Sequence, residues 1–165
     1  METHRSFVFS FRPELVAATS VMGAGAALEL GVIGKNGFYF SSELSGGGVY
    51  YGGLLNFGAC LNKDGAVKNV LGVSAGYHNT FLFVNFRKKN EIVKYETGTN
   101  LGVAGLFWKF MFGKDQNLDV TNRILFGYKK NPDIYNAKSD RIIFDEGFNA
   151  TWTLGVGYTL RRKRR

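Results

Sequence analysis

The 165-residue chain has little cysteine, little proline and no long apolar run. Its one cysteine, Cys60, excludes an internal disulfide framework and a cysteine-rich zinc site. No uninterrupted apolar stretch reaches the ~18 residues of a membrane-spanning helix. Two prolines against 22 glycines favour strands joined by tight turns. No change in composition marks a linker, so we expect a single domain.

Acidic residues are absent from one end of the chain, whereas the rest of the chain has a nearly balanced charge. The net charge is +8, and the final five residues, Arg161–Arg165, are all basic. Without them 16 Lys and Arg face 13 Asp and Glu, which leaves +3. This predicts a solvated basic tail, with anionic lipid headgroups as its candidate partner. No aromatic or Gly-rich RNA-binding signature accompanies it, so nucleic acid is not an expected partner.

No export signal is visible near the start. The apolar stretch RSFVFSF is interrupted by Arg12, Pro13 and Glu14 before a sufficient hydrophobic region develops. We interpret residues 1–15 as an N-terminal segment, either a remnant of a targeting segment or an extra strand.

The clearest feature that the sequence does contain is an alternation between apolar residues and small or polar residues. In FNATWTLGVGYTL, residues 148–160, large apolar residues and small or polar residues occupy opposite parities without exception. This is the pattern of a strand with two different faces. Turn signals lie between such stretches: a type I′ pair at Asn36-Gly37, a second at Asp64-Gly65, and residues 45–49 and 77–81. We expect eight strands, each uncertain by ~2–4 residues, near residues 16–33, 37–45, 48–61, 67–78, 81–88, 99–112, 118–129 and 147–160.

The two faces predict which side of the sheet is inside. Glycine, serine and threonine with isolated charges suit the narrow interior of an eight-stranded barrel. The predicted lumen side chains are Glu29, Glu43, Asn56, Lys68, Ser74, His78, Arg123 and Thr153. The predicted lipid-facing side chains are Leu28, Leu30, Val32, Leu55, Phe57, Leu71, Val73, Ile124, Phe126, Trp152, Leu154, Val156 and Tyr158.

Exposing the apolar face to water would cost tens of kcal/mol at ~25 cal/mol per Å², whereas a bilayer removes that penalty. The expected fold is therefore all-β: one closed, antiparallel, up-and-down transmembrane barrel over residues 16–160, with residues 161–165 as a basic tail. Aromatic residues near strand ends would form two interfacial girdles, namely Phe38, Tyr51, Tyr77, Tyr128, Phe148 and Tyr158. In residues 99–112 the parity of Trp108 predicts a bulge near Gly105.

The lengths of the connections agree with a membrane topology. The two long ones, residues 89–99 and 130–146, are the fifth and the seventh, so both emerge on one side of the sheet. Outer-membrane barrels have short periplasmic turns and longer external loops. The long connections are the expected places for recognition.

The alternation, the turns and the C-terminal WTLGVGYTL together resemble the small eight-stranded outer-membrane β-barrel proteins of Gram-negative bacteria. The resemblance covers roughly residues 16–160. In that family the last strand ends on an aromatic residue, whereas here it ends at Leu160 and continues into RRKRR. The resemblance implies an outer-membrane location and a role in anchoring, adhesion or ligand contact by external loops.

Two other functions remain open from the sequence. A soluble lipocalin-like barrel would turn the apolar parity toward a central cavity holding a small apolar ligand. A barrel-embedded lipid hydrolase would need a serine–histidine pair, and Ser74 and His78 share the lumen parity. Four residues along a strand separate them by about 13 Å, too far for the histidine to activate the hydroxyl. We therefore expect no enzyme, no cofactor, no metal, and a monomer with a side-chain-filled lumen.

Overall fold

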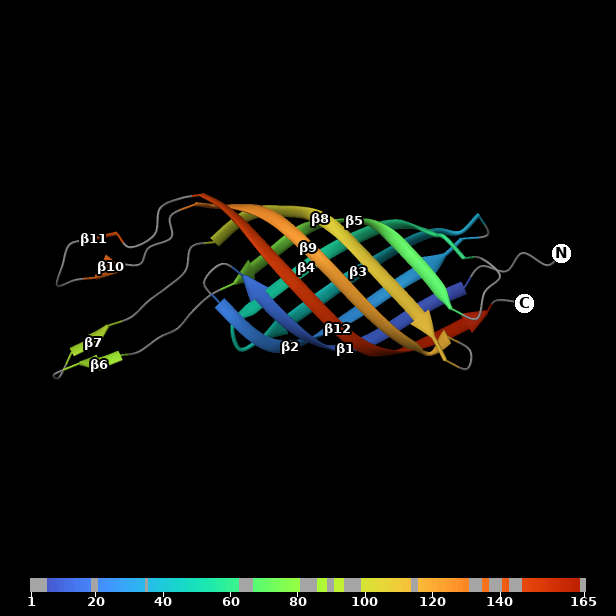
Figure 1. Ribbon diagram of the computed structural model, residues 1–165, viewed down its shortest axis with the longest axis horizontal. Helices are drawn as coiled ribbons and strands as arrows, with labels where there is room; N and C mark the ends of the chain where they lie inside the picture. The colour runs from blue at the N-terminus through green and yellow to red at the C-terminus, as the bar shows by residue number, and fades with distance from the viewer. Residues whose placement is uncertain are drawn as a thin grey trace.

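The computed structural model describes residues 6–18, 21–34, 36–62, 67–80, 86–88, 91–93, 99–113, 116–130, 135–136, 141–142 and 147–163. Its main sheet is a closed barrel in which every pair of neighbouring strands is antiparallel (Figure 1). The barrel strands are β1 (Ser6–Ala18), β2 (Val21–Ile33), β3 (Phe38–Gly47), β4 (Tyr50–Cys60), β5 (Lys68–Thr80), β8 (Thr99–Phe112), β9 (Leu118–Lys130) and β12 (Gly147–Lys163). Each pairs with its neighbours along the chain, and β12 closes on β1. The predicted fold class is confirmed.

The barrel begins at Ser6, so residues 6–15 belong to it and the predicted start at residue 16 is wrong. Phe9 pairs with Leu30 on one side and with Leu160 on the other. The predicted strand 16–33 is in fact the end of β1 followed by β2. Arg12 and Glu14 do not interrupt β1, because both side chains are buried on its inner face. At Pro13, which has no N–H to donate, the ladder to β12 stops after Phe11↔Tyr158 and resumes at Glu14↔Gly155.

No barrel strand stands between β5 and β8 among the described residues, because β5 pairs directly with β8, so the strand predicted at residues 81–88 is not found there. Residues 81–85 lie outside the described part of the chain. Phe86–Lys88 (β6) pairs instead with Glu91–Val93 (β7), and Tyr135–Asn136 (β10) pairs with Arg141–Ile142 (β11). Both two-stranded sheets lie beyond the barrel end opposite to the start of β1 and the end of β12 (Figure 1). The two long connections therefore share one side, as their lengths predicted.

The tight turns follow the sequence signals only in part. Gly37 has φ of 80°, and its N–H donates to the Gly34 carbonyl at 3.0 Å. This hydrogen bond closes a turn that runs from Gly34 to Gly37, so Asn36 and Gly37 are not its two central residues, as the predicted type I′ pair requires. Residues 48–49 join β3 to β4 as expected. Residues 77–80 are a continuation of β5 rather than a turn, and Asp64-Gly65 lies outside the described residues.

The large apolar side chains lie on the outside of the barrel. In β12 the side chain of Val156 is 55% exposed, whereas that of Thr153 is 1% exposed. The same alternation runs through β1, where Phe7, Phe9 and Phe11 are exposed between buried neighbours. The predicted bulge in β8 lies between Asn100 and Val103 rather than near Gly105. None of the described residues forms a helix long and apolar enough to cross a membrane.

Candidate functional site in the barrel lumen

The lumen holds most of the polar side chains predicted for it. Of that predicted set, Glu29, Glu43, Asn56, Ser74, His78, Arg123 and Thr153 are buried. Lys68 is half-buried, because it stands at the first position of β5, at the barrel end where β1 begins.

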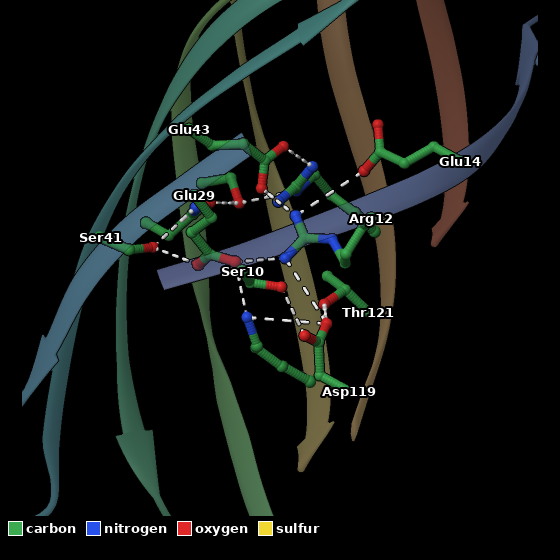
Figure 2. Close-up of polar contacts among 12 residues, drawn as sticks. Ser10, Arg12, Glu14, Glu29, Ser41, Glu43, Asp119 and Thr121 are labelled. Carbon is green, nitrogen blue, oxygen red and sulfur yellow. Dashed lines mark hydrogen bonds and ion pairs between the residues drawn. The ribbon is translucent and has the colours of Figure 1, made fainter. Parts of the chain in front are cut away.

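Arg12, the largest fully buried side chain, lies at the centre of the lumen. Its guanidinium donates hydrogen bonds to Glu29 and to Glu43, from strands β2 and β3. It also lies 3.6 Å from Asp119 and 3.7 Å from Glu14. Figure 2 shows the four carboxylates arranged around this one guanidinium. A guanidinium presents several N–H donors in a fixed plane and can bind several carboxylates at once, whereas a lysine ammonium is a compact point charge.

Two further cations complete the set of charges. Lys109 Nζ donates to Glu29 at 2.6 Å and lies 3.8 Å from Asp119. Arg123 binds both oxygens of Glu43, with Nη1 at 2.7 Å and Nη2 at 2.8 Å. We call Arg12, Glu14, Glu29, Glu43, Lys109, Asp119 and Arg123 the lumen cluster. With three cations and four carboxylates, its charges nearly cancel, as buried ions require.

Neutral side chains extend the lumen cluster to the remaining strands. Arg123 Nε donates to Ser74, whose hydroxyl donates to Asn56 at 2.6 Å. The Asn56 amide donates to Ser41 at 3.0 Å, and Ser41 donates to Glu29. Asp119 accepts from Ser10, Thr121 and Thr159. Every one of the eight barrel strands thus contributes at least one side chain to a single connected network.

Glycines on the inner face make room for the long side chains. A Cβ at Gly157 would stand 2.2 Å from Arg12 Cγ and 2.5 Å from the Phe11 carbonyl oxygen. A Cβ at Gly155 would stand 3.0 Å from Glu14 Cγ. Gly155 and Gly157 of β12 therefore leave the space that the side chains of Arg12 and Glu14, on the neighbouring strand β1, occupy.

Two apolar clusters close the lumen on either side of the charges. Toward the end where β1 begins, one cluster consists of Val8, Ile33, Tyr39, Cys60, Val70, Phe107 and Met111. Toward the end with the long connections, Leu54, Val103 and Leu125 form the other. The Tyr39 hydroxyl donates to Glu29, which joins the larger cluster to the charges.

Ser74 and His78 have different neighbours in the lumen. Ser74 is hydrogen-bonded to Asn56 and Arg123, whereas the His78 ring stacks on Tyr50 with centroids 5.4 Å apart. The Tyr50 hydroxyl donates to Glu14 at 3.3 Å. His78 is thus part of an aromatic stack near the loop end of the barrel.

All thirteen residues predicted to face lipid lie on the outer surface. Val32 and Leu154 are half-buried there and the other eleven are exposed. Contact with lipid stays a prediction. One polar side chain on this surface, Asn122, accepts a hydrogen bond from Trp152 Nε1 at 2.7 Å. Among the girdle aromatics, Tyr51 and Tyr77 lie side by side near the loop end, with their hydroxyls 3.3 Å apart.

Sequence reasoning missed several members of the lumen cluster. Arg12 and Glu14 were read as the end of an apolar segment, although both share the parity of Ser6 and Ser10. Lys109 was hidden between Trp108 and Phe110, whose size made the stretch look uniformly apolar. For Arg12 and Glu14 the signal was a charge on the parity opposite to Phe7, Phe9 and Phe11. Lys109 shares its parity with Phe107 and Met111, so alternation alone did not single it out.

The barrel is similar to solved structures of outer-membrane proteins. Neisserial surface protein A matches with a TM-score of 0.53 and 9% identity, over 94% of this chain and 96% of that one. The N-terminal β-barrel domain of Pseudomonas aeruginosa OprF gives a TM-score of 0.47 at 9% identity, over 93% and 97% of the two chains. Pseudomonas aeruginosa OprG gives 0.46 at 7% identity, over 99% and 98%.

No protein-family model matches the sequence, and neither does any curated protein. The structural likeness concerns the fold: this chain forms a small eight-stranded barrel of the outer-membrane type. The resemblance inferred from the alternation is confirmed at that level.

Proposed function

We propose that this protein is a monomeric outer-membrane barrel that anchors its two long connections at the outer membrane surface and is not a diffusion pore. The observation that carries the proposal is the belt of large apolar side chains that face outward around a closed barrel. Exposed leucine, valine and aromatic side chains occur on β1, β2, β4, β5, β8, β9 and β12. In water such a belt would far exceed the apolar patches that soluble monomers tolerate.

Closure of the sheet supports the same proposal. Hydrocarbon offers no partner for an unpaired backbone N–H or C=O, so a sheet in a bilayer must have no open edge. The pairing of β1 with β12 from Ser6↔Lys163 to Ala18↔Thr151 removes the only edge that the barrel could have had. The strands are 10–17 residues long, enough to cross a bilayer, which takes about 9–11 residues.

The filled lumen argues against a pore. The lumen cluster occupies the middle, and apolar clusters lie above and below it. A solute would have to break ion pairs between buried groups, and breaking one such pair costs about 3–5 kcal/mol. Function is therefore assigned to the outer surface and to the long connections, where recognition by loops is the proposed role.

The lipocalin-like alternative needs the opposite facing of the strands. It requires Trp152 and Tyr158 in a central cavity, whereas both side chains are exposed and Thr153 is buried. The described part of the lumen is lined with hydrogen-bonded charges rather than with a surface for an apolar ligand.

The test combines membrane extraction with electrophoresis. The full chain is expressed behind a cleavable export signal in a Gram-negative host, and the outer membranes of that host are extracted with detergent. We expect the protein in the outer-membrane fraction, soluble only with detergent, and migrating faster on a gel when unheated than when boiled. In planar bilayers the purified barrel should give no stable open channel. A water-soluble protein without heat-dependent migration would refute the membrane assignment, and a steady conductance would refute the closed lumen.

A further inference from the structure

Four neighbouring strands form an apolar groove on the outer surface of the barrel. It has a volume of about 560 Å³, and its lining includes Val8, Gly31 and six outward residues. Two rows that follow the register build it: Phe7, Val32 and Phe40 in one, and Leu160, Phe9 and Leu30 in the other. None of the eight described residues that line it is charged, so a hydrocarbon chain is the occupant that its surface fits.

Positive charge lies directly beside this groove. β12 continues past Leu160 through Arg161, Arg162 and Lys163, and its backbone stays paired with β1. Phe7, in the groove wall, pairs with Arg162, and Val8 pairs with Arg161. Three consecutive basic residues thus occupy paired strand positions next to the groove, and Arg162, opposite the groove residue Phe7, shares the outward parity of Leu160. Arg161 and Lys163 share the parity of Thr159 and add positive charge at the same strand end. Basic residues at the end of a membrane strand lie at the level of the lipid headgroups.

We propose that this surface binds one anionic glycerophospholipid, with an acyl chain in the groove and its phosphate at Arg162, at the strand end whose positive charge Arg161 and Lys163 increase. This inference rests on the proposed membrane function and adds a ligand class and a place. The residues that line the groove belong to the start of β1 and β3 and to the end of β2 and β12. Figure 1 shows the start of β1 and the end of β12 at the barrel end opposite β6, β7, β10 and β11, so the lipid belongs to the periplasmic leaflet. The charge of the headgroup and the length of the acyl chain must both contribute to the affinity, because the basic strand end fits only the headgroup and the apolar groove fits only the acyl chain.

Each half of the site has a substitution that removes it and a matched control. The triple variant Arg161→Gln, Arg162→Gln, Lys163→Gln removes three charges beside the groove. The control Arg87→Gln, Lys88→Gln, Lys89→Gln removes three charges from the long connection at the opposite end. Val32→Trp fills the groove, and its control Val73→Trp adds the same ring to an outward position on β5, on the far side of the barrel from β1.

The experiment counts lipids on the purified, delipidated barrel by native mass spectrometry. The barrel is incubated with equal amounts of phosphatidylglycerol and phosphatidylcholine that carry the same acyl chains. We expect one bound phosphatidylglycerol, preferred roughly five-fold or more over phosphatidylcholine. The basic-end variant should bring that ratio to about one, Val32→Trp should lower binding of both lipids several-fold, and both controls should behave as the unmodified protein.

Several outcomes would overturn the lipid site. They are an unmodified protein without headgroup preference, a control variant that loses as much as its partner, or displacement of the lipid by excess glycerol 3-phosphate. The heat-dependent gel shift is read first on every sample, and Arg162→Gln alone replaces the triple variant if the latter does not fold. A shifting barrel without preference refutes the lipid site only, whereas absence of a shift in the unmodified protein refutes the membrane function.

Discussion

At the scale of single residues, the contact between Gly157 and Arg12 is the tightest fit in the lumen wall of β12. A methyl group at Gly157 would overlap both Arg12 Cγ and the backbone of Phe11. We therefore expect Gly157→Ala to destabilise the barrel by about 1–3 kcal/mol. Urea unfolding of the barrel in detergent, followed by tryptophan fluorescence, measures this loss. Gly48→Ala is the control, because a Cβ there meets nothing within 4 Å. Equal stability of both variants would contradict the packing described.

Arg123 and Glu43 provide the clearest test of how the charges depend on one another. Their ion pair is bidentate and nearly fully buried. Arg123→Met leaves Glu43 with Arg12 as its remaining cation, and we expect a loss of about 3–5 kcal/mol. The double variant Arg123→Met, Glu43→Gln also removes the carboxylate that has lost its bidentate partner, and it should recover part of that loss. Unfolding of the two variants under identical conditions compares them, and a double variant less stable than the single one would show that the charge is not the cause.

At the scale of the strand, β12 shows how well the sequence predicts which side chains point out of the barrel and which point into the lumen. Its alternation predicted correctly that Trp152, Val156 and Tyr158 lie outside and Thr153 inside. We expect Val156→Arg to cost about 2–4 kcal/mol in a bilayer, because the position is near the middle of the strand. Phe148→Arg, on the same face at the end of the strand, should cost about 0–1 kcal/mol. Reversible folding into lipid vesicles measures both, and equal costs would be incompatible with a membrane-spanning strand.

Other strands were harder to predict, and the reasons are physical. β1 contains Arg12, Pro13 and Glu14, which local rules read as a break. They are tolerated because Glu29 and Glu43, distant in sequence, pair with Arg12 and because Pro13 lies on the outside. The segment at residues 81–88 is as apolar as a strand in its first half, yet β5 pairs with β8. Local alternation cannot reveal which strands pair, nor which buried charges will meet.

The lumen cluster was predictable as a kind of site but not as a set of partners. Placing Glu29, Glu43 and Arg123 on the inner parity needed only alternation. The link between Arg12 on β1 and Asp119 on β9 depends on the closure of the barrel and on the stagger of its strands. These are properties of the closed sheet that no single strand carries.

At the scale of the whole molecule, the barrel and the long connections are separable. In the part of the chain that the structure describes, the pairing of β5 with β8 and of β9 with β12 runs between residues of these strands, and β6, β7, β10 and β11 pair only among themselves. The network that joins all eight strands also lies entirely within the barrel strands. We therefore expect that replacing residues 82–97 and 132–145 by short Asn-Gly turns leaves the heat-dependent gel shift in place. Stability to urea should change by no more than about 1 kcal/mol, because shortening a flexible connection alters only its closure entropy.

The same variant separates the two proposals about the surface of the protein. Any adhesion or ligand contact made by the long connections should disappear in whole-cell binding assays with the shortened barrel. The preference for phosphatidylglycerol should remain, because Arg161–Lys163 and the groove lie at the other end of the strands. A shortened barrel that no longer folds would mean that the connections contribute to barrel assembly, in contradiction to the independence argued from the strand pairing.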